Sequence, residues 1–82
     1  GRSAEDMVRV AELYHALDAA LESLPSRDRL MVKLRFEDGL PIAEISRNLG
    51  FANRFSAHRH LADVLRTLRR ALERSGVRDT VP

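Results

Sequence analysis

PIAEISRNLGFANRFSAHRHLADVLRTLRRAL, residues 41–72, is the stretch of sequence that decides the fold. It opens with a short run whose apolar side chains recur at helical spacing, at Ile42, Ile45 and Leu49. Pro41 suits the first position of such a helix, where its missing N–H leaves no hydrogen bond unmade, and Gly50 ends the helix. A longer helix is predicted from about residue 55 to residue 74. Two helices joined by a glycine turn have the proportions of a helix-turn-helix.

The longer helix has an apolar face and a polar face. Its predicted buried side chains are Ala57, Leu61, Val64, Leu65, Leu68 and Leu72. At 100° per residue, four polar side chains fall together on an outward stripe, namely Ser56, Arg59, His60 and Asp63. Side chains of these types read base edges in the major groove, which is wide enough for one helix. We therefore predict DNA binding through this stripe, with the alternative that Asp63 forms a salt bridge to Arg59 one turn earlier.

Several arginines near this unit are placed to meet DNA phosphates, which give affinity and register but no sequence information. They are Arg27, Arg35, Arg47 and Arg54, with Arg54 expected in the turn. Residues 46–82 hold eight arginines and three acids, whereas residues 1–45 hold six basic and nine acidic residues. The halves thus carry charges of about +5 and −3, which indicates an anionic partner for the second half or a solvated basic face.

Two more helices precede this unit. The first is predicted over residues 5–24, capped by Ser3, with Val10, Tyr14, Leu17, Leu21 and Leu24 on one face. The second is predicted over residues 27–37, capped by Ser26, with Leu30, Met31 and Leu34 facing inward and Gly39 after its end.

No stretch has the alternation of a strand, so the fold class is all-α. We expect residues 1–82 to form a single compact four-helix domain with a C-terminal helix-turn-helix over about residues 41–74 and no wing. Residues 77–82 are predicted to be a frayed tail. Because the chain opens without a methionine, we expect it to be a piece cut from a longer protein.

Composition excludes several classes of function. The chain has no cysteine, so it has no disulfide and no thiolate metal or redox site, which fits a cytoplasmic protein. No apolar run approaches the ~20 residues of a membrane span. His58 and His60 point about 200° apart on a helix, so no metal site is expected. Neither Ser46 nor Ser56 has a base near it, and we predict neither enzyme activity nor a cofactor.

Five short motifs together resemble a known family. They are LESLPSRDR at 21–29, LRFEDGL at 34–40, EIS at 44–46, LG at 49–50 and LR at 68–69. In this order and spacing they are similar to region 4 of bacterial sigma-70 family factors, nearest to the extracytoplasmic-function (ECF) branch. Two features depart from the family pattern. Pro41 stands where the family has Ser or Thr, and the turn over residues 50–56 is about one residue longer.

The resemblance implies that the helix-turn-helix reads the −35 element of promoter DNA during transcription initiation. It also implies that the domain docks on the β flap of the RNA polymerase core and that an anti-sigma factor can mask it. By position, Arg29 and Arg35 match the family's arginines of the second helix, and Glu44 matches the acid of the third.

Two other functions remain open at this point. The first is that the helix-turn-helix is the output domain of another transcription regulator, such as a response regulator. Alternatively, the domain keeps the fold as a protein-interaction module without DNA binding. Exposed apolar surface on the first two helices would also allow a homodimer of the isolated domain.

Phe51 is expected under the turn, and Phe55 either staples the start of the last helix or touches a thymine methyl.

Overall fold

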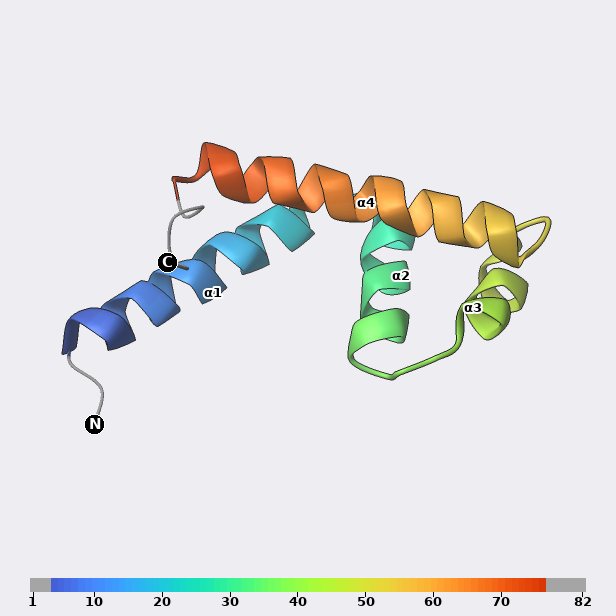
Figure 1. Cartoon of the computed structure of the whole chain (residues 1–82), viewed down its shortest axis with the longest axis horizontal. Helices are drawn as coiled ribbons and strands as arrows, with labels where there is room; N and C mark the ends of the chain where they lie inside the picture. The colour runs from blue at the N-terminus through green and yellow to red at the C-terminus, as the bar shows by residue number, and fades with distance from the viewer. Residues whose placement is uncertain (1–3, 77–82) are drawn as a thin grey trace.

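Four α-helices make up residues 4–76, the part of the chain that the computed structural model describes, and this part contains no strand. They are α1 (Ala4–Glu22), α2 (Ser26–Phe36), α3 (Ile42–Leu49) and α4 (Arg54–Arg74). Helix α4 is the longest, and the other three helices lie on one side of it, with the start of α1 extending beyond its C-terminal end (Figure 1). The predicted all-α fold with four helices and a C-terminal helix-turn-helix is confirmed. No described helix is long and apolar enough to cross a lipid bilayer.

A proline immediately precedes α2 and another immediately precedes α3, and these prolines mark where the two helices begin. Pro25 and Pro41 are N-cap residues with extended ψ angles of 148° and 150°, so neither belongs to the helix that follows. The carbonyl of Pro25 accepts from the Arg29 N–H, and that of Pro41 accepts from Glu44 and Ile45. Two expectations are therefore corrected. Pro41 precedes α3 instead of opening it, and Ser26 lies inside α2, which has no side-chain cap.

The turn between α3 and α4 depends on Gly50 and Asn53. Gly50 has a φ of 76°, the left-handed conformation that costs a glycine little, and its N–H bonds to the Ser46 carbonyl. The side chain of Asn53 accepts a 2.9 Å hydrogen bond from the Ser56 N–H and so caps α4. Helix α4 consequently begins at Arg54, which is its first residue and not part of the turn.

The buried side chains form two separate clusters, and both use α4. The first consists of Ala20, Leu24, Val64 and Leu68, and joins the end of α1 to the second half of α4. The second consists of Met31, Ile45, Ala57 and Leu61, and joins α2 and α3 to the first half of α4. The α4 members of both clusters belong to the apolar face that the sequence predicts. Leu65 of that face is only partly covered, with 37% of its surface exposed.

Large apolar side chains in the first half of α1 are exposed to solvent. Tyr14 is 64% exposed and Val10 is 40% exposed, so these two members of the apolar face are not buried. The reason is that α1 packs on α4 near its own end, where Ala20 is buried. Leu30 of α2 was expected inside, and this expectation is wrong because the residue is 43% exposed. The predicted Ser3 cap and the tail over residues 77–82 lie outside the described residues.

Candidate nucleic-acid interface

The first half of α4 presents its outward face to solvent. Arg59 and Asp63 are exposed there, on the side of the helix opposite the buried Ala57 and Leu61. Within residues 4–76, Arg59 makes no hydrogen bond or ion pair, so its five N–H donors are free to meet a ligand. This face carries a guanidinium without a competing protein partner, at the place where a helix-turn-helix meets base edges.

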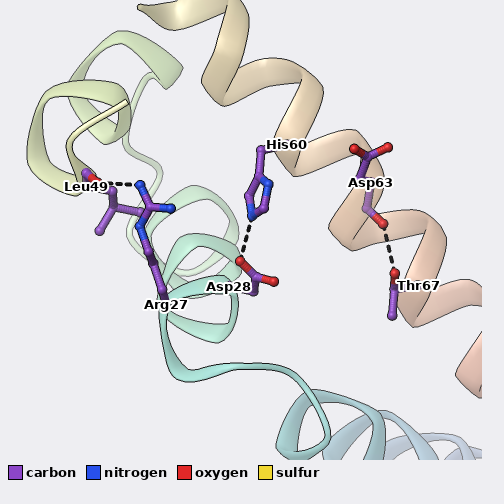
Figure 2. A network of polar contacts seen from close by, with 6 residues as sticks. All are labelled: Arg27, Asp28, Leu49, His60, Asp63 and Thr67. Atoms are coloured by element: carbon purple, nitrogen blue, oxygen red, sulfur yellow. Dashed lines mark hydrogen bonds and ion pairs between the residues drawn. The ribbon is translucent and has the colours of Figure 1, made fainter. Parts of the chain in front are cut away.

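His60 does not share that outward stripe. Its Nε2 lies 2.6 Å from Oδ1 of Asp28 on α2, and its ring centroid is 5.4 Å from that of Phe51 (Figure 2). His60 follows Arg59 by one residue and is therefore turned about 100° from it, which directs the imidazole toward α2. The expectation that His60 points outward is corrected, because its ring nitrogen is bonded to Asp28 of α2.

Ser56 and Asp63 also have partners of their own. Ser56 is half-buried, and its backbone N–H is the donor in the Asn53 cap. Asp63 forms its ion pair with Arg66, at 3.1 Å, and not with Arg59 as the alternative interpretation had it. Its backbone carbonyl accepts a hydrogen bond from the Thr67 hydroxyl (Figure 2). Arg59 is thus left without an acidic neighbour to orient it.

The four arginines expected at phosphates fall into two pairs. Arg27 donates to the Leu49 carbonyl at 2.5 Å, and Arg35 donates to the Leu40 carbonyl at 3.0 Å. Arg47 is exposed on α3 and has no polar partner among the described residues. Arg54 is exposed at the start of α4. Arg47 and Arg54 therefore keep more of their hydrogen-bonding capacity for an external anion than the first pair does.

Two aromatic side chains flank the turn in different ways. Phe51 packs against the second cluster, as expected, and the Arg27 guanidinium lies 4.3 Å from its ring centroid. Phe55 is 64% exposed, and the guanidinium carbon of Arg54 lies 5.1 Å from its ring centroid. Phe55 therefore does not act as a buried staple at the start of α4.

Helix α2 braces both helices of the helix-turn-helix. Arg27 holds the end of α3 through the Leu49 carbonyl and the turn through Phe51, while Asp28 holds α4 through His60 (Figure 2). We call these contacts the α2 brace. Sequence reasoning missed the brace because spacing within one helix gives no sign of which residue of another helix lies opposite. The only sequence feature that pointed to the brace was the pair of charged residues at the start of α2, Arg27 and Asp28.

Asp28→Ala tests the brace. The substitution removes the acceptor from His60, and we expect the free energy of unfolding to fall by about 1 kcal/mol, the typical worth of such a hydrogen bond. Urea unfolding followed by circular dichroism at 222 nm measures the change. Asp18→Ala, the same substitution at an exposed site of α1, should have little effect. Equal losses in the two variants would show that the Asp28–His60 contact adds no stability.

A comparison with protein families gives one match. The family model described as "Sigma-70, region 4" matches residues 14–74, from the second half of α1 to the end of α4. The chain belongs to the sigma-70 region 4 family. Neither a search of curated proteins nor a search of solved structures found a match to it.

Membership of this family settles the general class of function. Region 4 domains bind DNA in transcription initiation, they interact with promoter DNA and the RNA polymerase core, and the family is not one of enzymes. The match spans α2, α3 and α4 completely, so it contains the helix-turn-helix, the α2 brace and both buried clusters. In this region 4 domain the exposed first half of α4 is the candidate surface for DNA.

Proposed function

We propose that this region 4 domain reads the −35 element of bacterial promoters as part of an RNA polymerase holoenzyme, in a sigma factor of the ECF type. The observation that carries the proposal is the exposed, unpartnered Arg59 on the outward face of α4. A guanidinium there can bond to guanine in the major groove with two parallel hydrogen bonds. Bacterial promoters and their polymerase lie in the cytoplasm, so the proposal places the domain there.

The other candidate residues take separate roles in this proposal. Arg59 and Asp63 meet base edges, with Ser56 near them at the start of α4. Arg47 and Arg54 bind phosphates on either side of the groove. Arg27, whose guanidinium is engaged by Leu49, acts mainly through the α2 brace. By the same reasoning Arg35 supports the loop before α3, and His60 orients α4 instead of reading a base.

Selection from a random duplex library tests the proposal. The 82-residue chain is incubated with the library at low salt, and the bound duplexes are amplified and sequenced over several rounds. We expect one short motif to be enriched, and each base change in it to weaken binding by about 5- to 150-fold, which corresponds to ~1–3 kcal/mol. Enrichment of no motif, with binding that depends only on salt, would contradict sequence-specific reading.

An apolar groove lies between α1, α2 and α4, away from the outward face of α4. Its apolar lining includes Leu17, Leu21, Leu30, Phe36, Leu65 and Leu68. Phe36 is 60% exposed and Leu30 is 43% exposed, so the groove keeps large apolar side chains in contact with solvent. We place the β flap of the RNA polymerase core in this groove. An anti-sigma factor, or a second copy of the isolated domain, would compete for the same surface.

Leu30→Glu tests the groove. A charge at the centre of an apolar contact must lose its hydration on binding, so we expect affinity for core polymerase to fall by at least about tenfold. Affinity for DNA should be unchanged, because Leu30 lies away from the outward face of α4. Met7→Glu introduces the same charge at an exposed apolar site outside the groove and should have no effect. Equal polymerase binding by both variants would rule out the groove.

A further inference from the structure

Three arginines form a line along the solvent side of α4. At 100° per residue, Arg66 and Arg70 lie within about 20° of the direction of Arg59, opposite the face that carries both buried clusters. All three are exposed. No other helix of the described chain covers this side of α4, since α1, α2 and α3 pack on the other side (Figure 1). We call Arg59, Arg66 and Arg70 the arginine ridge.

The ridge has little acid to neutralise it. Helix α4 has six arginines and two acids, Asp63 and Glu73. Arg66 pairs with Asp63, but both side chains are more than half exposed, and a pair of this kind contributes little and is easily exchanged for another anion. Arg59 and Arg70 make no hydrogen bond or ion pair within residues 4–76. Arg66 and Arg70 are also four residues apart, where like charges on a helix repel.

The helix dipole does not account for the ridge. Basic side chains are favoured in the last turn of a helix, which explains Arg74 and in part Arg70. The effect falls off within that turn, whereas Arg66 lies about two turns before the end of α4 and Arg59 about four. Exposed arginines at these places are better explained by an anionic surface that runs along the helix.

The spacing of the ridge fits the wall of a DNA groove. With a rise of about 1.5 Å per residue, Arg66 lies ~10 Å and Arg70 ~16 Å along the axis from Arg59. The major groove is about 12 Å wide. A helix that brings Arg59 to base edges therefore carries Arg66 to the far wall of the groove and Arg70 just beyond it. Each arginine then has a row of phosphates within the length of its side chain.

We propose that Arg66 and Arg70 extend the DNA contact of α4 beyond its reading end, by binding phosphates of the strand that borders the groove. The inference rests on the proposed function, because Arg59 must first lie at the base edges. It assigns the second half of α4 to DNA backbone contact, and it predicts a longer contact along the duplex than the residues near the turn would make alone.

The salt dependence of DNA binding tests the ridge. Fluorescence anisotropy gives the affinity of the chain for a labelled duplex between about 50 and 200 mM salt, for wild type and for Arg66→Gln/Arg70→Gln. Two lost phosphate contacts should lower the slope of log affinity against log salt by about 1.8. Over that range wild type would lose affinity by about 12-fold more than the variant. Arg9→Gln/Lys33→Gln, on α1 and α2, removes the same charge and should keep the wild-type slope.

The outcomes separate the ridge from the proposed function. Arg59→Gln should lower the preference for the selected motif over a scrambled duplex, while the ridge variant should keep that preference and show a smaller salt slope. An unchanged slope in the ridge variant, with the preference intact in wild type, overturns the ridge alone. If the ridge variant loses polymerase-dependent transcription while its salt slope for DNA binding stays unchanged, the proposal is also overturned. The ridge would then be assigned to binding an acidic protein surface. A wild-type chain with no motif preference overturns the proposed function instead.

Discussion

Ile45→Ala is expected to lower the free energy of unfolding by about 2–5 kcal/mol, the range for truncating a large aliphatic side chain in a core. Ile45 is fully buried, and it joins α3 to Met31, Ala57 and Leu61 in the second cluster. Small domains are stable by only about 5–15 kcal/mol, so this loss takes a large part of the total. Since α3 has only eight residues, it depends on this cluster for its position in the helix-turn-helix.

Urea unfolding monitored by circular dichroism measures this effect. Ile42→Ala is the matched control, because it is the same substitution on the same helix at a half-buried position. It should cost clearly less, since less apolar surface is returned to water. DNA binding by Ile45→Ala should fall together with the folded fraction. A variant with wild-type stability would mean that the second cluster does not hold α3.

Arg59→Ala is expected to weaken binding to the selected motif by about 5- to 150-fold, which corresponds to the ~1–3 kcal/mol of a bidentate arginine–guanine contact. Affinity for unrelated duplex DNA should change far less, because phosphate contacts remain. Stability should stay near that of wild type, because Arg59 is exposed and makes no hydrogen bond or ion pair to another described residue. The loss should therefore appear as a fall in the ratio of specific to non-specific affinity.

Arg69→Ala provides the control for Arg59→Ala. It removes the same side chain from the same helix, at an exposed position about 80° away from the arginine ridge. It should leave motif preference intact. In transcription by core polymerase with a sigma factor that carries this domain, Arg59→Ala should reduce use of promoters with the motif. Unchanged promoter use would show that Arg59 does not read DNA.

The helices could be predicted because local chemistry marks their ends. Pro25, Pro41 and Gly50 punctuate the chain, and apolar side chains recur at helical spacing between them. The errors at helix starts come from the same prolines. A proline fits both the first helical position and the extended position before it, and only ψ distinguishes the two. The Asn53 cap of α4 was missed although asparagine is a favoured N-cap residue.

The candidate site was harder to predict than the fold. The angle of Arg59 around α4 follows from helical periodicity, and the structure confirms that it is exposed. The environment of His60 depends on Asp28, which lies 32 residues earlier in the chain. Periodicity within one helix does not predict contacts between residues so far apart in the sequence. The apolar spacing in α1 predicts the helix but not its burial, because an apolar face can be formed without another helix to cover it. Tyr14 is the clearest example.

The two buried clusters have a consequence for how the length of α4 can change during evolution. Ala57 and Leu61 serve one cluster, and Val64 and Leu68 serve the other, all from a single face of one continuous helix. Inserting or deleting one residue between Leu61 and Val64 would rotate one cluster by about 100° relative to the other. Substitutions on the outward face therefore leave both clusters in place, whereas insertions and deletions are tolerated by the packing only in the turns and at the helix ends.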